Sequence, residues 1–252
     1  MVVVAVVVVE VVIVKKNKVI EIKNLSHNFG DKVIYENLNV GIYEGSVFGL
    51  LGKNGVGKST LINILMGYLK PTQGECLIFG EHSHNLSSQS KREIALLHEG
   101  FVTYDYMSIE QIEKFFAPFY PLWDKTIFYQ LVDLMGLSYS QKVHSLSFGQ
   151  RSQVVLGCLF AQNAKLLILD DYSMGLDAGY RRLFIDYLKD YIHNTNKTVL
   201  ITSHVMSDLE KLIDDMIIIQ KGGIIHKDTM QNFNKDKTTT FEDNFLNFVG
   251  KY

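Results

Sequence analysis

The stretch Gly52-Lys53-Asn54-Gly55-Val56-Gly57-Lys58-Ser59-Thr60 has the spacing G-x-x-x-x-G-K-S, which is the P-loop pattern. Glycines in such a loop let successive backbone N–H groups turn inward as an anion-binding nest, and the helix that follows adds the positive end of its dipole. Lys58 is expected to reach the β- and γ-phosphates of a nucleotide, and the Ser59 hydroxyl to bind Mg²⁺. A glycine-rich turn without a ligand is the alternative, but the Lys-Ser pair and both flanking patterns would then have to coincide by accident.

The segments around this loop have the pattern that a P-loop requires. The apolar run 46–51 predicts a buried strand before the loop, and apolar residues at helical spacing in 61–66 predict a helix after it. Further segments at 94–99, 166–171 and 198–204, which are mainly apolar and end in polar residues, also predict strands. Continuous apolarity is typical of strands that are buried on both faces of a parallel sheet. The sequence therefore predicts an α/β fold with a parallel core sheet.

Polar residues follow each of these core strands. Because the carboxyl ends of parallel strands meet at one edge of the sheet, where ligands bind, we expect these side chains to converge. The residues expected to meet one Mg-nucleotide there are Lys58, Glu99, Asp170, Asp171 and His204. Two carboxylates at the end of a buried strand are costly unless they contact a metal or its bound water.

A small antiparallel sheet is expected before the P-loop. Segments 19–25 and 34–40 have the alternation of strands, and a turn at 29–32 joins them. Phe29 is the one aromatic residue at the tip of this hairpin. It is either a half-exposed turn residue or a platform that stacks on an adenine ring.

An aromatic-rich segment with helical periodicity runs from Met107 to about Leu137. Pro118 and Pro121 predict a bend between two helices. We expect a helical insert with its own satellite core, in which most of the rings are packed; a groove that faces a partner is the functional alternative. The rings are Phe115, Phe116, Phe119, Tyr120, Trp123, Phe128 and Tyr129.

The composition is that of an ordinary globular chain and argues against a nucleic-acid partner. Of the 252 residues, 47% are hydrophobic and 21% are charged, and the formal net charge is −2. A nucleic-acid-binding domain would carry a basic footprint. Cys76 and Cys158 lie in apolar stretches and are expected to be buried free thiols. Residues 1–17 are a valine-rich extension that suits a strand and is too short for a membrane-spanning helix.

The motifs, in this order, resemble those of the ATPase subunit of an ABC transporter. The P-loop is a complete Walker A match. The stretch Leu146-Ser147-Phe148-Gly149-Gln150 resembles the LSGGQ signature of that family, with Phe148 in place of the first glycine. Residues 166–170 resemble Walker B, residues 175–177 resemble the D-loop, and His204 resembles the switch histidine.

The resemblance covers roughly residue 19 to the end and implies a P-loop NTPase fold. It implies a RecA-like parallel core, an N-terminal antiparallel β subdomain and a helical subdomain inserted at about 100–160, all within one ATPase domain of residues 18–252. Glu99 stands where the family usually has glutamine, and residues 241–245 resemble the short C-terminus of one subgroup. Both features favour the ABC-2-type exporters.

The resemblance also implies a mechanism in which ATP is held between the P-loop of one subunit and the signature of a second ATPase subunit, identical or different. Closure and reopening of this dimer would drive a separate transmembrane permease. The ATPase is then expected in the cytoplasm, bound to the permease at the inner face of the membrane. The implied nucleotide contacts are Phe29, Asn54, Gly55, Gly57, Lys58, Ser59, Thr60, Ser147, Gly149, Gln150 and Asp177; the implied Mg²⁺ contacts are Ser59, Glu99 and Asp170; the implied catalytic residues are Lys58, Asp171 and His204.

Asp171 departs from the family pattern, which has glutamate directly after the Walker B aspartate. Its carboxylate is one methylene shorter, so a water-orienting base would sit about one ångström too far back, and a misplacement of that size can cost roughly 10²-fold in rate. We therefore expect an ATPase that hydrolyses ATP slowly or by an adjusted geometry. The alternatives are a soluble ABC-type ATPase that acts on ribosomes or DNA, and a nucleotide-gated regulatory subunit that barely hydrolyses ATP.

Overall fold

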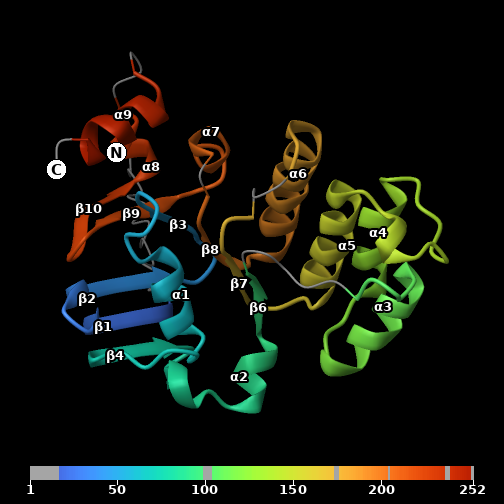
Figure 1. The fold of residues 1–252 in the computed structure, drawn as a ribbon, viewed down its shortest axis with the longest axis horizontal. Coiled ribbons are helices and arrows are strands. Elements are labelled where there is room, and N and C mark those ends of the chain that lie inside the picture. Colours follow the sequence, from blue (N-terminus) through green and yellow to red (C-terminus); the bar gives the residue numbers. More distant parts are fainter. Residues whose placement is uncertain (1–16, 99–103, 173–175, 204, 236–238, 251–252) are drawn as a thin grey trace, which may run out of the picture.

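The chain forms two β-sheets and a separate helical layer (Figure 1). The structure is a computed structural model that describes residues 17–98, 104–172, 176–203, 205–235 and 239–250. Along the described chain, no helix is both long enough and apolar enough to cross a membrane.

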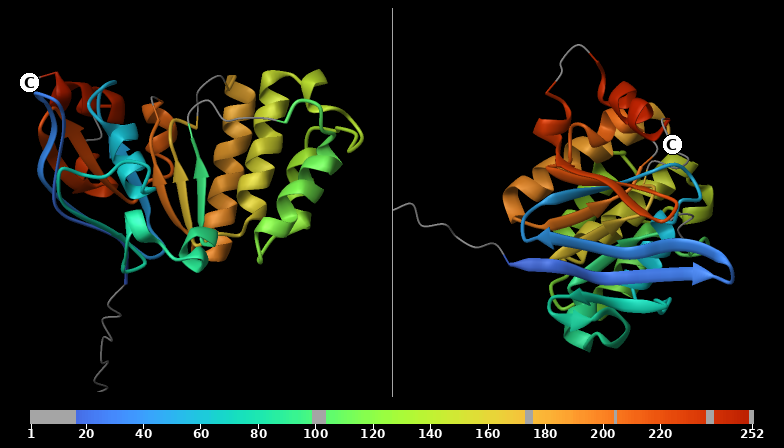
Figure 2. Two further views of the ribbon diagram at one scale, coloured as in Figure 1. Left: turned by 60° about the horizontal axis from the view of Figure 1, so that its bottom comes forward. Right: turned by 90° about the vertical axis from the view of Figure 1, so that its left-hand side faces the viewer.

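The N-terminal sheet is antiparallel and has the strand order β2-β1-β4-β5. Its strands are β1 (Lys18–Phe29), β2 (Lys32–Tyr43), β4 (Gln73–Ile78) and β5 (Glu81–His82). The long hairpin β1–β2 is the one predicted from the alternating pattern, and both strands run further than the pattern indicated (Figure 2). Gly30 makes the sharp turn between them with a φ of +57°, a left-handed conformation that glycine adopts without steric cost.

The core sheet has six strands in the order β10-β9-β3-β8-β7-β6. Five of them are parallel, and the edge strand β10 is antiparallel to β9. The strands are β3 (Val47–Leu51), β6 (Ile94–Leu97), β7 (Leu166–Leu169), β8 (Thr198–Ile201), β9 (Asp215–Gln220) and β10 (Gly223–Thr229). The predicted parallel sheet is confirmed, and the C-terminal hairpin β9–β10 extends this sheet beside the P-loop strand.

Helices and the first sheet cover the two faces of the core sheet, which explains the continuous apolar runs. On β7, Leu166 and Ile168 pack toward α1 (Lys58–Leu65) and the N-terminal sheet, whereas Leu167 and Leu169 pack toward the opposite helices. Those helices are α5 (Phe148–Ala161) and α6 (Ala178–Thr195), which bring Phe160 and Phe184 into the same cluster. The other helices of the core are α2 (Ser88–Arg92), α7 (Met206–Leu209), α8 (Met230–Phe233) and α9 (Phe241–Val249).

Between β6 and β7, the chain forms the helical layer and its satellite core. Helices α3 (Ile109–Phe116) and α4 (Lys125–Asp133) pack with α5 around the fully buried Phe128. Pro118 lies in the short turn between α3 and α4, as expected. Most of the rings pack as expected, because Phe116, Trp123 and Tyr129 lie against the same core. Phe115 and Phe119 are the exceptions and are exposed, because α3 turns its Ile109–Ile112 face inward.

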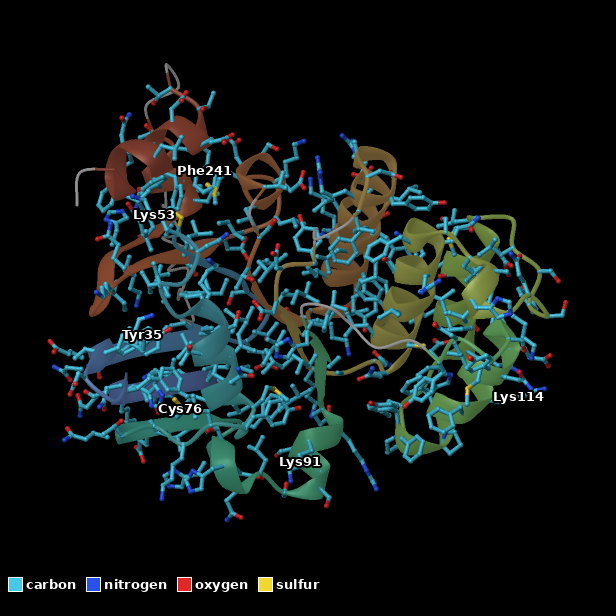
Figure 3. All side chains as sticks on the ribbon, in the orientation of Figure 1. Tyr35, Lys53, Cys76, Lys91, Lys114 and Phe241 are labelled. Atoms are coloured by element: carbon cyan, nitrogen blue, oxygen red, sulfur yellow. The ribbon has the colours of Figure 1, made fainter. Side chains whose placement is uncertain are left out.

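Both cysteines are buried, as predicted. Cys76 lies on β4 beneath the hairpin (Figure 3), and burial raises the pKa of its thiol to about 12. Burial also raises the pKa of Cys158. Neither thiol is therefore a thiolate at neutral pH. The sequence did not predict α9, whose Phe241 and Phe245 pack into the core under the sheet edge.

Candidate functional site

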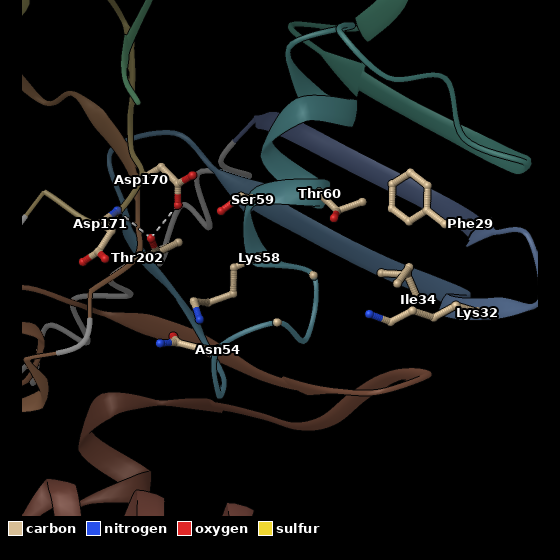
Figure 4. A pocket seen from close by; sticks show the side chains of 12 residues that line it. Phe29, Lys32, Ile34, Asn54, Lys58, Ser59, Thr60, Asp170, Asp171 and Thr202 are labelled. Carbon is tan, nitrogen blue, oxygen red and sulfur yellow. Dashed lines mark hydrogen bonds between the residues drawn. The ribbon is translucent and has the colours of Figure 1, made fainter. Parts of the chain in front are cut away.

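A pocket lies where the P-loop, the tip of the β1–β2 hairpin and the carboxyl ends of β7 and β8 meet (Figure 4). Its volume is about 390 Å³, which is within the usual range of small-molecule sites. The residues that line it are Phe29, Lys32, Ile34, Asn54, Gly55, Gly57, Lys58, Ser59, Thr60, Asp170, Asp171 and Thr202. All but Lys32, Ile34 and Thr202 were predicted from the sequence to lie at one site.

The P-loop wraps the start of α1 and depends on its glycines. Gly57, the N-cap of α1, has a φ of +118°, and a Cβ on it would lie 2.7 Å from the Tyr35 hydroxyl oxygen. That hydroxyl donates to the Gly57 carbonyl at 2.5 Å, which ties the hairpin to the loop. The Lys58 ammonium donates to the carbonyls of Gly52 and Lys53, at 2.9 and 3.2 Å. A cation and the N–H groups of a helix start therefore face one pocket, which is an arrangement that binds anions.

Two buried carboxylates form the opposite wall of the pocket. Asp170 is 2% exposed, and its backbone N–H donates to the Leu97 carbonyl at 2.9 Å. Its Oδ1 accepts from the Thr202 hydroxyl at 2.9 Å, whereas its buried Oδ2 has no hydrogen-bond partner among the described residues. Asp171 follows with a φ of +48°. A buried, unpaired carboxylate oxygen beside a phosphate-binding loop is suited to a cation.

Phe29 forms the outer end of the pocket. Its ring is 52% exposed and lies edge-on to the ring of His27, with 4.7 Å between the centroids. Burial lowers the pKa of His27, so the imidazole is neutral at physiological pH and supports Phe29 as an uncharged ring. This leaves a flat apolar surface available to a planar ring.

The signature residues do not line this pocket. Ser147 is the N-cap of α5, and it exchanges hydrogen bonds with Gln150: Gln150 N–H donates to Ser147 Oγ at 3.2 Å, and Ser147 N–H donates to Gln150 Oε1 at 3.0 Å. The helix begins at Phe148, so Phe148, Gly149 and Gln150 of the signature form its first turn. Asp177 caps α6 by accepting from the Tyr180 N–H at 3.0 Å.

Predictions for three further positions concern residues outside the described parts of the chain. These are Glu99, the first D-loop residue Gly175, and His204.

Comparisons with known proteins identify the family. Residues 35–173 match the family model described as ABC transporter, which is more than half of the chain. The chain belongs to the ABC transporter ATP-binding family. It is therefore an ATP-binding subunit of an ABC transporter and an ATPase.

Individual relatives agree with this assignment. An uncharacterized ABC transporter ATP-binding protein, YhcH of Bacillus subtilis (strain 168), is 31% identical over 88% of this chain and 74% of its own length. A probable sulfate/thiosulfate import ATP-binding protein, CysA of Chlorella vulgaris, is 30% identical over 89% of this chain and 97% of its own. A solved ATP-binding subunit of an ABC transporter shares the fold, with a TM-score of 0.78 at 21% identity, and covers 92% of this chain and 99% of its own.

Sequence reasoning missed three residues that line the pocket of this ABC ATPase. Lys32 could have been found from the hairpin, because it is the cross-strand partner of Phe29. Thr202 directly follows a predicted core strand, where polar residues were expected to meet the ligand. Ile34 gave no signal beyond its place in an apolar strand.

Gly149 of the signature is required by packing against α6. A Cβ on Gly149 would lie 2.3 Å from Cδ2 of the Tyr180 ring. We expect Gly149→Ala to displace Tyr180 and to lower the free energy of unfolding by about 1–3 kcal/mol, as measured by urea denaturation. Gly179→Ala is the matched control, because a Cβ there meets only the Asp177 side chain at 3.3 Å. Equal stability of the two variants would contradict this packing argument.

Proposed function

We propose that this ABC ATPase hydrolyses ATP in a pocket shared between two ATPase subunits, with the P-loop of one subunit covered by the signature of the other. The observation that carries the proposal is that the phosphate-binding residues and the signature residues lie apart within one chain. Phosphate-binding, aromatic and acidic residues line one pocket, whereas the signature and Asp177 lie at the starts of α5 and α6, where Ser147 and Asp177 are exposed. The start of a helix carries the positive end of its dipole, which suits the γ-phosphate of ATP bound to a second subunit.

Within the pocket, each proposed role follows from the chemistry of the side chain. Asn54, Gly55, Gly57 and Thr60 belong to the loop and helix start that hold the phosphates, and Lys58 supplies the cation. Phe29 stacks on the adenine. Asp171 orients the attacking water, with His204 as the proposed γ-phosphate contact.

The residues present fit a Mg²⁺ ion that accompanies ATP. The buried Asp170 Oδ2 lacks a hydrogen-bond partner among the described residues, and the Ser59 hydroxyl lines the same pocket (Figure 4). Mg²⁺ is usually bound through one or two protein oxygens together with substrate phosphates and water. Asp170 and Ser59 would hold it, with Glu99 as a further proposed contact. When bound, the ion neutralises charge on the phosphates.

A permease contact is proposed on the helical layer. Tyr104, Phe115 and Phe119 form an exposed aromatic cluster, with ring centroids 5.1 Å apart for Tyr104–Phe115 and 5.7 Å for Phe115–Phe119. Exposed apolar clusters of this kind mark interaction sites. The cluster follows the segment that contains Glu99, so a cytoplasmic helix of the permease would dock between the core and the helical layer. The ATPase would thereby be held at the inner face of the membrane.

Glu99 and residues 241–245 carry the proposal that the transporter is an exporter of the ABC-2 type. The second ATPase subunit is, in the simplest arrangement, another copy of this chain.

Complementation between two defective variants tests the shared pocket. Lys58→Ala removes the cation of the P-loop, and Ser147→Arg places a bulky cation on the signature. Each homodimer has no intact site, whereas a mixed dimer has one intact site and one doubly defective site. Mixing equal amounts should therefore restore about a quarter of the wild-type rate of phosphate release, since half of the dimers are mixed. No recovery in the mixture would contradict a pocket shared between copies of this chain.

A further inference from the structure

The hydroxyl of Thr202 bonds to both acidic residues at the end of β7, to the side chain of Asp170 and to the backbone of Asp171 (Figure 4). Thr202 directly follows β8 and is 0% exposed. Its Oγ1 donates to Asp170 Oδ1 at 2.9 Å and accepts from the backbone N–H of Asp171 at 2.8 Å. One side chain on the neighbouring strand thus contacts both acidic residues of the site.

The direction of both hydrogen bonds is fixed by the groups involved. The Asp171 N–H can only donate, so the hydroxyl oxygen must accept from it. An ionised carboxylate can only accept, so the single hydroxyl proton must point at Asp170. The hydroxyl therefore cannot rotate toward another acceptor without breaking a buried hydrogen bond.

The first bond orients the Asp170 carboxylate. With Oδ1 held by Thr202, rotation about the bond to the carboxylate is restricted, and Oδ2 is the oxygen that lacks a partner among the described residues. A hydrogen bond of this kind, to the oxygen that does not bind the metal, fixes the direction of the one that does.

The second bond fixes the backbone at Asp171. At the end of β7, the Thr202 N–H donates to the Leu169 carbonyl at 2.9 Å, which is the last backbone bond between β7 and β8 before the turn. The next N–H, that of Asp171, bonds to a side chain instead, and Asp171 takes a φ of +48°. This left-handed conformation is uncommon for residues other than glycine and turns the chain out of the strand direction at the residue proposed to orient water.

We propose that Thr202 is a positioning residue for the metal–nucleotide site: its hydroxyl aims Asp170 Oδ2 at Mg²⁺ and holds Asp171 in the turn that brings its carboxylate to the pocket. The inference rests on the proposed function, in which Asp170 contacts Mg²⁺. A threonine that served only to fill space in the core would be replaceable by valine, which has nearly the same shape.

Two substitutions of Thr202 distinguish the effect of its hydroxyl from the effect of its side-chain shape. Thr202→Val keeps the volume and removes the hydroxyl, and Thr202→Ser keeps the hydroxyl and removes a methyl group. The measurement is the affinity of the purified protein for ATP with Mn²⁺ and for ATP with EDTA, by calorimetry; Mn²⁺ replaces Mg²⁺ because its electron paramagnetic resonance spectrum also reports the ligand field.

We expect Thr202→Val to weaken Mn²⁺·ATP binding by about 10- to 100-fold, which is the usual effect of losing a group that orients a metal ligand. Metal-free ATP affinity should change little, because the P-loop holds the phosphates, and it serves as a check that the variant is folded. Thr202→Ser should bind Mn²⁺·ATP nearly as tightly as the wild type. Turnover of Thr202→Val should also fall more than its Mn²⁺·ATP affinity, since Asp171 is displaced as well.

Unchanged Mn²⁺·ATP affinity in Thr202→Val would overturn the inference and leave the proposed function intact. A wild-type protein whose ATP affinity gains nothing from Mn²⁺ would overturn both. If Thr202→Val does not fold, Thr202→Ala removes the same hydroxyl with less volume and takes its place. The serine variant tests the inference independently, because a loss as large as that expected for valine would show that the hydroxyl is not what matters.

Discussion

Lys58→Ala is expected to lower ATP turnover by at least about 100-fold, because it removes the cation that would face the charge developing on the phosphates. The Lys58 ammonium lies inside the P-loop, where it contacts the carbonyls of Gly52 and Lys53, and no other lysine or arginine of the described chain except Lys32 lines the pocket. Lys32 comes from the hairpin at the outer end of the pocket beside Phe29 (Figure 4) and does not replace it. The measurement is phosphate release by the purified protein under saturating MgATP.

Lys53→Ala is the matched control for this result. Lys53 belongs to the same loop, is exposed, and does not line the pocket. It should retain most of the wild-type rate. Equal rates for wild type and Lys58→Ala would show that the observed phosphate release does not come from this site.

Asp171→Glu is expected to raise the rate of ATP turnover. The increase is as much as about 100-fold if the slow rate is due entirely to a base that lies about one ångström too far from the water. The added methylene extends the carboxylate into the pocket that Asp171 already lines. The backbone is a competing effect, because aspartate adopts the left-handed region more readily than most residues. The variant should therefore be slightly less stable, and turnover must be measured below its unfolding temperature.

Asp170→Glu is the control for the same chemical change one residue earlier. The Asp170 carboxylate is already held by Thr202 at 2.9 Å, and an added methylene would push it out of that bond. Its turnover should fall, whereas that of Asp171→Glu rises. If Asp171→Glu is no faster than the wild type, then Asp171 is not an impaired catalytic base.

The main elements of the fold were predictable because they follow from local patterns. The apolar run of β7 predicted a strand buried on two faces, and the structure places its alternate residues in two separate clusters. The hairpin β1–β2 was predicted from its alternation and its glycine turn. Helix α9 was missed although Phe241, Phe245 and Val249 recur at helical spacing, because a pattern over only nine residues is a weak signal without the core surface that these residues cover.

The candidate site was predictable to the extent that its residues form a contiguous motif or end a core strand. The P-loop residues and Asp170 and Asp171 met in one pocket as expected. Thr202 and Tyr35 could not be assigned roles, because their hydroxyls act through hydrogen bonds to segments that are distant in the sequence. Exposure of Phe115 and Phe119 was missed because the periodicity of an aromatic-rich helix does not show which face packs inward.

The sequence alone determined that this chain has a phosphate-binding loop between a strand and a helix, acidic residues at a strand end, and an ABC-type order of motifs. Those features are set by residue type and spacing along the chain. Only the tertiary structure decided which oxygen of Asp170 lacks a partner among the described residues, which hydroxyl holds the other oxygen, and that the signature helix lies off the pocket of its own chain. These depend on the register between strands β7 and β8 and on how α5 packs against α6, which are set by contacts between residues far apart in sequence.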